Sequence, residues 1–367
     1  MGDKGGGWPD MRKIILQRLP VSKPIIIRMC ARAGGAPGIL ACMNRRHFLY
    51  SSMALSTATA VGSGTVLSKT TEAVPESMDV RQFHATRKFV DLPYGRIAYV
   101  ERGQGATALF LHGYPLNGYQ WRGALSRLST HRRCIAPDFL GLGYTEVPAE
   151  ADLRPGAQVA MLAEFLDTLG GETIDIVAND SGGAVAQLFA ARYPRRVRTL
   201  LLTNCDASTD CPPKALGPLI EDARRGTAAD KYVAQPLKDH VLARSPQGLV
   251  GACFTYPDRF LDETLDCYLG AFAQSPLRMR QYELFAMALE KNVLLEIEPA
   301  LRRFKSPVRI LWGTGDTIFS ADSPDRLSRT FPSSRGVRRV EGAKLFWPEE
   351  FPDLIAQEAR RLWSVPA

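Results

Sequence analysis

A short apolar run at residues 173–177 (TIDIV) leads directly into a turn of small and polar residues at 178–183 (ANDSGG). The run is rich in β-branched residues, which favours a strand. An apolar helical pattern follows from Ala184 to Tyr193. A strand that passes into a helix through such a turn is the layout of a nucleophile elbow, which holds one exposed side chain in a strained position.

The elbow allows only small residues two positions before and after its exposed side chain, because these neighbours would otherwise collide. Asp180 meets this requirement with Ala178 and Gly182, whereas Ser181 would have Asn179 as a neighbour. We therefore predict Asp180 as the nucleophile. A carboxylate would attack a saturated carbon or a strained ring and form an alkyl ester that must then be hydrolysed. A polar helix N-cap is the alternative reading of the same residues.

Composition limits the classes of function. The chain has 367 residues, 45% hydrophobic and 23% charged, which is typical of soluble globular proteins. Its formal net charge of +8 is uneven, because residues 1–73 hold ten Lys and Arg against three Asp and Glu. The remainder is nearly neutral, so we expect no nucleic-acid partner. No stretch approaches the roughly 18 consecutive apolar residues of a membrane span, so we expect no stable membrane insertion.

The basic N-terminal segment has its own signature. Residues 45–46 are two arginines ahead of a stretch rich in Ser, Thr and Ala. This arrangement resembles a bacterial twin-arginine export signal. We expect residues 1–75 to be a leader. Within it, Met43 is the expected translation start, and small-residue cleavage sites lie near Ala60 and Ala73. Export to the periplasm or cell envelope follows, and a disordered basic tail on a cytoplasmic protein is the alternative.

Strand and helix patterns alternate after the leader. Residues 88–90 and 96–100 flank a Pro-Tyr-Gly turn and predict a hairpin. Further strands are predicted at 108–111, 134–136, 197–203, 308–312 and, more weakly, 338–341, with helices at 158–169 and 349–363. This alternation predicts an α/β fold with a mostly parallel central sheet flanked by helices.

The pattern changes between Asp206 and Ala300, where helical segments and scattered prolines occur without a strong strand. We expect residues 207–300 to form a helical cap inserted between two core strands. The core then comprises residues 87–206 and 301–367. The sequence does not indicate an oligomeric state.

Two further motifs accompany the elbow: HGYP at residues 112–115 and APDFLGLG at 136–143. With them, the chain from about residue 87 onward resembles the α/β-hydrolase fold superfamily. It is most similar to the branch of haloalkane dehalogenases and epoxide hydrolases, which use an aspartate nucleophile. The resemblance implies a hydrolase that acts on a small apolar molecule of haloalkane or epoxide type, with no metal and no organic cofactor.

The resemblance also implies roles for individual residues. The backbone amides of Tyr114 and Ser181 would stabilise developing negative charge, and His112 would be structural. The acid of this family often follows a late strand, which points to Asp316, with Asp206 as the alternative acid. Both aspartates also suit ordinary turns or helix caps.

The family's general base is a histidine just before the last helix, and Leu345 occupies that place within residues 342–350 (GAKLFWPEE). A leucine cannot take a proton from water, so the first half-reaction would proceed and the second would stall. Lys344, Asp316 and the cap residue His240 are candidate substitutes. A non-catalytic binding protein on the same fold is the competing hypothesis, and a serine hydrolase using Ser181 is a third.

Two further departures concern the substrate. Haloalkane dehalogenases typically follow the nucleophile with a tryptophan that helps to bind halide, and Ser181 stands in that position. Epoxide hydrolases use cap tyrosines to protonate the ring oxygen. The predicted cap offers four, which could instead serve packing: Tyr232, Tyr256, Tyr268 and Tyr282.

Of the seven cysteines, five lie outside the leader, and none has the spacing of a metal site. Export would permit disulfides, for which Cys205 with Cys211 and Cys253 with Cys267 are candidates. Buried free thiols are the alternative.

Overall fold

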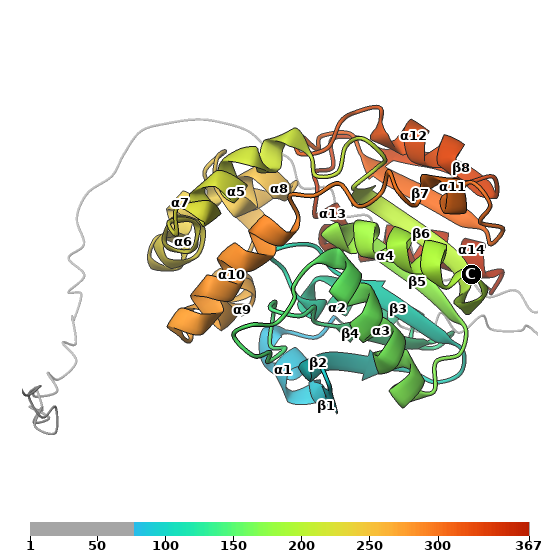
Figure 1. The fold of residues 1–367 in the computed structure, drawn as a ribbon, viewed down its shortest axis with the longest axis horizontal. Coiled ribbons are helices and arrows are strands. Elements are labelled where there is room, and N and C mark those ends of the chain that lie inside the picture. Colours follow the sequence, from blue (N-terminus) through green and yellow to red (C-terminus); the bar gives the residue numbers. More distant parts are fainter. Residues whose placement is uncertain (1–76, 367) are drawn as a thin grey trace, which may run out of the picture. The chain divides into compact units, whose positions relative to one another are not determined.

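One eight-stranded sheet, in the order β1-β2-β4-β3-β5-β6-β7-β8, forms the centre of the part that the computed structural model describes, residues 77–366 (Figure 1). The strands β1 and β2 pair antiparallel, as do β2 and β4, and all other neighbours are parallel. The mostly parallel sheet is therefore confirmed. Its strands are β1 (Lys88–Leu92), β2 (Gly95–Arg102), β3 (Thr107–Leu111), β4 (Arg133–Pro137), β5 (Ile174–Asp180), β6 (Val197–Cys205), β7 (Val308–Gly313) and β8 (Ser334–Val340).

The central strands are buried along their whole length. All five residues of β3 and all seven of β5 are buried, which explains why both read as nearly continuous apolar runs in the sequence. The two strands pair in parallel from Thr107 with Ile174 to Leu111 with Ala178. Because β5 is enclosed by β3 and β6, its carboxyl end lies at a defined point in the middle of the sheet.

Helices pack on this sheet in pairs. The helix α2 (Arg122–Leu128) packs against α14 (Pro352–Trp363), and α3 (Pro155–Leu169) packs against α4 (Ser181–Arg192). The helix α12 (Ser323–Thr330) covers β7 and β8. The predicted final helix over about 349–363 is present as α14, but it begins only at Pro352, after the separate short helix α13 (Trp347–Glu350). Proline has no N–H to continue a helix but is well suited to a first turn.

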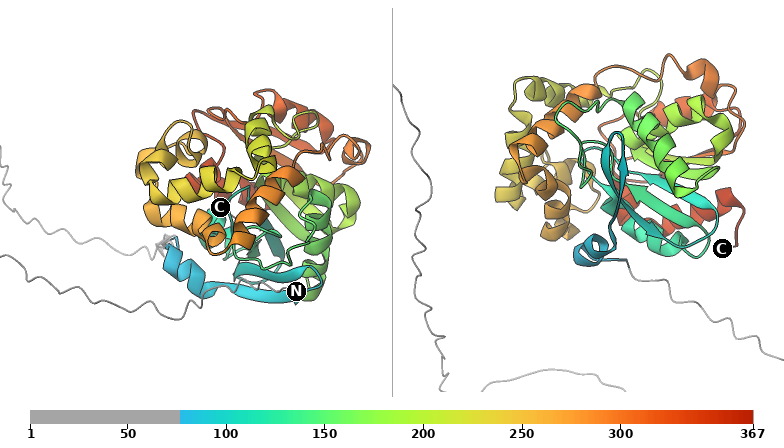
Figure 2. Two further views of the ribbon diagram at one scale, coloured as in Figure 1. Left: turned by 60° about the vertical axis from the view of Figure 1, so that its left-hand side comes forward. Right: turned by 60° about the horizontal axis from the view of Figure 1, so that its bottom comes forward.

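A group of helices lies between β6 and β7 in the sequence and confirms the inserted helical cap. Figure 2 shows them side by side next to the sheet, coloured yellow to orange. They are α5 (Gly217–Arg224), α6 (Gln235–Lys238), α7 (His240–Arg244), α8 (Leu249–Cys253), α9 (Asp262–Ala273) and α10 (Pro276–Ala288). The short helix α11 (Glu298–Leu301) follows and packs against α4 of the core.

A helix that the sequence analysis did not predict, α1 (Val80–Thr86), joins the core to the cap through contacts with β2 and α9. Its buried Phe83 ring meets the Tyr119 ring edge-on at 5.2 Å. The signal was present as a capping box, in which Asp79 accepts from the Gln82 backbone and the Gln82 side chain accepts from the Asp79 backbone.

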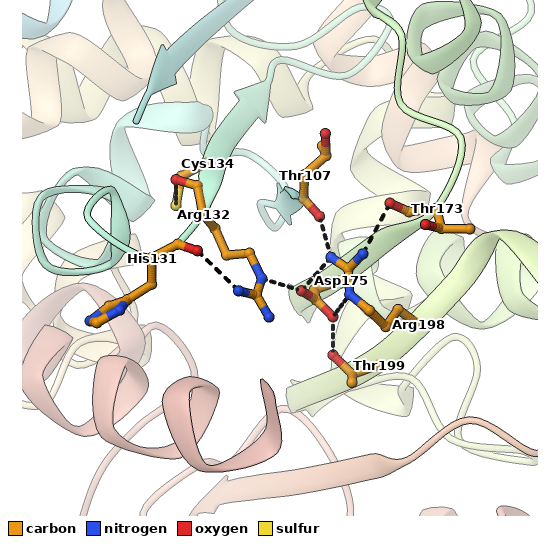
Figure 3. Close-up of polar contacts among 8 residues, drawn as sticks. All are labelled: Thr107, His131, Arg132, Cys134, Thr173, Asp175, Arg198 and Thr199. Atoms are coloured by element: carbon orange, nitrogen blue, oxygen red, sulfur yellow. Dashed lines mark hydrogen bonds and ion pairs between the residues drawn. The ribbon is translucent and has the colours of Figure 1, made fainter. Parts of the chain in front are cut away.

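A buried ion network ties the strands together at the end of β5 opposite Asp180 (Figure 3). The carboxylate of Asp175 is fully buried. It accepts from Nε of Arg132 at 2.8 Å, Nη2 of Arg198 at 2.6 Å and Oγ1 of Thr199 at 2.7 Å. These contacts link β5, β6 and the segment before β4, so they fix the amino ends of the strands that carry the elbow.

Some predictions fall outside the described residues, namely the leader with its twin arginines, its start at Met43 and its cleavage sites. Within residues 77–366, no helix is both long and apolar enough to cross a membrane. In the same range, no cluster of three or more His, Cys, Asp or Glu side chains could hold a metal ion.

Candidate active site

Asp180 is the last residue of β5 and the strained residue of the turn into α4. Its backbone has φ of 53° and ψ of −133°, a conformation that residues other than glycine rarely adopt. The turn depends on close approach by the glycines that follow. A Cβ on Gly182 would lie 2.5 Å from the carbonyl oxygen of His112, and one on Gly183 would lie 2.3 Å from a cysteine Cβ on β6. Asp180 occupies the N-cap position of α4, but its side chain makes no capping hydrogen bond to the helix interior, so capping does not account for this residue.

Two backbone amides converge on the buried carboxylate of Asp180. The N–H of Tyr114 donates to Oδ2 at 2.8 Å and is also 3.0 Å from Oγ of Ser181, and the Ser181 N–H bonds the carboxylate too. Burial raises the pKa of Asp180 to about 7, these amides oppose the rise, and the charge of Asp316 adds to it. The two predicted charge-stabilising donors therefore both face the predicted nucleophile.

The loop that carries Tyr114 is held close to the elbow by its neighbours. The fully buried His112 accepts from the Phe139 N–H at Nε2 (3.1 Å), so its Nδ1 carries the proton and donates to the Gly113 carbonyl at 3.0 Å. Burial lowers the pKa of His112. One ring nitrogen bonds the loop itself and the other bonds the segment after β4, so His112 holds the two segments together.

A cavity of about 420 Å³ lies at the junction of core and cap. Its wall includes Asp180, Ser181, Tyr114 and Asp206. Much of the remaining wall is apolar and includes Leu216, Leu219, Leu249, Leu289, Ile318 and Phe319. This size and lining suit a small, largely apolar organic molecule. The predicted nucleophile thus lines a cavity large enough for a small molecule.

Asp316 lies in the loop after β7, as predicted, but it is not among the residues that line the cavity. Its Oδ2 accepts from Nδ2 of Asn204 at 2.8 Å, and its Oδ1 accepts from the Ile318 N–H at 2.8 Å. The Phe319 N–H is a third donor. Burial raises the pKa of Asp316 to about 6, against the effect of these donors. Its acceptor sites are therefore largely occupied.

Asp206, the alternative acid, follows β6 and lines the cavity with only 6% of its surface exposed. The preceding residue, Cys205, pairs with Asp180 across β5 and β6, so the two aspartates project from adjacent strand ends. The Cys211 side chain bonds the Asp206 carboxylate, and Gln187 donates to the Asp206 carbonyl at 2.8 Å. Burial raises the pKa of Asp206, and the charge of Asp180 raises it further.

Residues 109–346 match the family described as the α/β hydrolase fold. The chain belongs to the α/β-hydrolase fold family. It is 22% identical over 290 residues to epoxide hydrolase 1 of Caenorhabditis elegans, covering 75% of this chain and 69% of that protein. It is 27% identical over 275 residues to haloalkane dehalogenase 2 of Mycobacterium tuberculosis, covering 73% and 92%. The solved epoxide hydrolase CorEH superimposes with a TM-score of 0.63 at 23% identity, over 76% of this chain and 98% of that one, which shows the fold alone.

In this α/β-hydrolase-fold protein the position expected for the catalytic histidine is filled by Leu345. Its side chain is 3% exposed and lines the cavity together with Asp180. No histidine of the described range lines that cavity. His240 of the cap instead lies 3.1 Å from Asp262 and 3.3 Å from Asp266, on α9. The other described histidines are His84, His112 and His131.

Lys344, one of the predicted candidates for a general base, is held by contacts outside the cavity. Its Nζ donates to the carbonyl of Gly251 at 2.6 Å, and its backbone N–H donates to Oγ1 of Thr255 at 3.2 Å. Lys344 is also not among the residues that line the cavity. Both contacts tie the loop before α13 to the α8 region of the cap, which is a structural role.

Two of the four cap tyrosines line the cavity, Tyr232 and Tyr282. The Tyr232 hydroxyl donates to Asp222 at 2.9 Å, and the Tyr282 ring lies 5.1 Å from the Tyr114 ring. Burial raises the pKa of both cavity tyrosines, so they stay protonated at neutral pH. The other two do not reach the cavity: Tyr268 bonds Glu349, and Tyr256 is largely exposed.

Two buried asparagines support the site and were missed by the sequence analysis. Asn204 holds Asp316, accepts from the Gly313 N–H at 2.7 Å and accepts from Trp347 Nε1 at 2.9 Å. Asn179 donates to the carbonyl of Leu345 at 3.1 Å. The sequence feature that could have revealed them is an asparagine at the end of an otherwise apolar, buried strand. A buried amide without hydrogen-bond partners would destabilise the fold, so such a residue is expected to have specific partners.

The five described cysteines are buried and free, so neither candidate disulfide is formed. Cys253 lines the cavity, while Cys267 belongs to α9. Burial raises the pKa of all five thiols, as expected for thiols that pack as small apolar side chains.

Proposed function

We propose that this protein is a hydrolase whose carboxylate Asp180 attacks a carbon atom of a small apolar electrophile, of epoxide or haloalkane type. The observation that carries the proposal is the strained Asp180, which faces a cavity beneath the cap while two backbone amides hold its carboxylate. Such a group is positioned before the substrate arrives, so little reorganisation is needed for attack.

The reaction has two halves. In the first, a carboxylate oxygen of Asp180 forms a bond to carbon, and the bond from that carbon to the leaving halide or ring oxygen breaks with its electron pair. In the second, water adds to the carbonyl carbon of the new ester, and the alcohol leaves. The amides of Tyr114 and Ser181 would stabilise the negative oxygen that develops in the second half.

The cavity lining favours an epoxide over a haloalkane. Opening an epoxide requires a proton for the ring oxygen, and the cap tyrosine Tyr282 lines the cavity, whereas the Tyr232 hydroxyl already donates to Asp222. Ser181 replaces the tryptophan expected for halide binding, and no tryptophan of the described chain lines the cavity. Named relatives include both an epoxide hydrolase and a haloalkane dehalogenase, so both classes belong in a substrate panel.

Leu345 favours a second candidate function, a binding protein without turnover. A leucine in the place of the base leaves the ester without the usual activated water. The two candidates differ in whether Asp180 becomes alkylated. A binding protein would retain the small molecule without forming a covalent bond.

Mass spectrometry distinguishes these functions. The protein is incubated with a panel of epoxides and haloalkanes, and we expect a mass increase equal to the opened epoxide or the alkyl group on the peptide containing Asp180. Asp180→Asn should lose the adduct, while Ser181→Ala should keep it and the protein should not react with a fluorophosphonate probe. Absence of adduct and product across the panel would contradict the proposal, and labelling of Ser181 would indicate a serine hydrolase.

A further inference from the structure

The second half-reaction of the proposed function needs a group that takes a proton from water, and Leu345 cannot do so. We propose that Asp206 is this general base, acting directly on the water that hydrolyses the Asp180 ester. The inference rests on the proposed function and goes beyond it, because it changes Asp206 from a supporting acid into the residue that activates water.

Position is the first argument. Cys205 and Asp180 are paired residues of two adjacent parallel strands, and Asp206 follows Cys205 directly. Both carboxylates contribute to the wall of the same cavity. The water of the second half-reaction would therefore bind in the cavity that both residues line.

Availability of the carboxylate is the second argument. The side-chain partner of Asp206 is the Cys211 thiol, which is a weak donor. Within residues 77–366 no Lys, Arg or His forms an ion pair with Asp206, and the cavity-lining Lys231 pairs with Asp222 at 2.8 Å instead. An ion pair would have stabilised the charged form and weakened the base, so its absence here leaves Asp206 able to accept a proton.

Asp316, the other candidate base, differs from Asp206 in its position and in the availability of its carboxylate. It does not line the cavity, and it accepts from Asn204, Ile318 and Phe319. Three donors leave few lone pairs for water. Asp316 is therefore better suited to holding the loop after β7 than to accepting a proton from water.

The surroundings of Asp206 also make it a stronger base than an exposed aspartate. Burial, followed by the charge of Asp180, raises its pKa above the ordinary value of 3.8. A carboxylate with a raised pKa binds a proton more tightly, so the ionised form of Asp206 is a stronger base than an exposed aspartate. Once Asp180 is esterified it is neutral, so its charge no longer opposes ionisation of Asp206, and the ionised form of Asp206 takes the proton from water.

The step balances in atoms and charge. Asp206 removes a proton from water as the water oxygen bonds to the ester carbonyl carbon, and the tetrahedral oxyanion faces the amides of Tyr114 and Ser181. Collapse breaks the bond between that carbon and the alkoxy oxygen, and Asp206 returns its proton to the leaving oxygen. The products are the alcohol, the carboxylate of Asp206 and the carboxylic acid of Asp180, which then releases its proton to solvent.

The lifetime of the adduct tests the inference. The full protein is alkylated with the epoxide that labels Asp180 best, excess reagent is removed, and loss of the adduct is followed by intact mass. We expect Asp206→Asn to form the adduct and to retain it about 10²-fold longer than the wild type, as removal of a general base predicts. The control Asp152→Asn removes an exposed carboxylate that pairs with Arg154 and does not line this cavity, and it should decay like the wild type.

A second variant guards against a folding defect. Asp206→Ala should also retain the adduct, and added formate, a small carboxylate, should shorten its lifetime. The inference is overturned if both Asp206 variants lose the adduct at the wild-type rate, if Asp316→Asn alone slows the loss, or if the wild-type adduct never decays. Failure of the wild type to form any adduct would instead remove the proposed function, and this inference with it.

Discussion

The backbone N–H of Tyr114 and Oδ2 of Asp180 lie 2.8 Å apart, although 66 positions separate the two residues in the sequence. The parallel pairing of β3 with β5 produces this contact, because the loop after one strand and the elbow after the other meet at the same edge. The amide offsets part of the cost of burying the carboxylate. The same Tyr114 amide is also placed to bond the carbonyl of the ester that forms on Asp180.

The first prediction concerns the pH dependence of alkylation. Burial raises the pKa of Asp180 to about 7, and only the ionised carboxylate is nucleophilic. The rate of adduct formation should therefore rise roughly tenfold per pH unit below pH 7 and level off above it. Stopped incubations between pH 5 and 9, analysed by intact mass, measure this rate. A rate already constant at pH 5 would show an ordinary carboxylate pKa.

The second prediction is the stability of Asp180→Asn. The folded pKa exceeds the ordinary value of 3.8, so the native state binds the proton more tightly and loses stability as pH rises from about 4 to 7. The asparagine variant lacks this titration. We expect it to exceed the wild type at pH 8 by up to ~4 kcal/mol in free energy of unfolding and to match it near pH 3. Urea unfolding at both pH values measures the difference, and a pH-independent difference would contradict it.

The third prediction is a gain of turnover in Leu345→His. The side chain at 345 lines the cavity with Asp180, so an imidazole there supplies the base that the family uses. Turnover of an epoxide that alkylates Asp180 should rise at least tenfold, as expected for an added general base. Leu345→Phe fills a similar volume without a base and should show no gain. A gain in both variants would point to packing rather than proton transfer.

The fourth prediction tests the close approach at Gly113. A Cβ there would lie 2.6 Å from both Cβ and Oδ2 of Asp180, so Gly113→Ala must displace the loop or the nucleophile. Adduct formation should fall about 10²-fold. Gly156→Ala in α3 is the matched control, because nothing lies within 4 Å of its added Cβ, and its adduct formation should be unchanged. Equal rates in the two variants would show that the loop adapts freely.

The fifth prediction concerns the ion network at the opposite end of β5. Asp175→Asn removes the charge that Arg132 and Arg198 share in a buried position, and should lower the free energy of unfolding by on the order of 3 kcal/mol. Asp152→Asn breaks an exposed pair with Arg154 and should change it by less than about 1 kcal/mol. Chemical denaturation of both variants measures the difference. A similar small effect in both would mean that solvent reaches the network.

Local chemistry was sufficient for the elbow. The small residues around Asp180 and the apolar run before it allowed the strand, the turn and the following helix to be predicted from sequence. The same holds for the central strands, because burial on both faces requires continuous apolar runs. The helix after Leu345 was predicted too long, since the break at Pro352 was not weighed against the apolar pattern.

The sequence by itself determined the sheet, the cap and the absence of a histidine at position 345, because each depends on residue types at short spacing. Only the tertiary structure decided that Asp206 faces the cavity while Asp316 is bound by three donors, and that Tyr114 meets Asp180. These relations depend on which strands are neighbours and how closely loops approach. These spatial relations arise between residues that are far apart in the chain, so a local sequence pattern does not predict them.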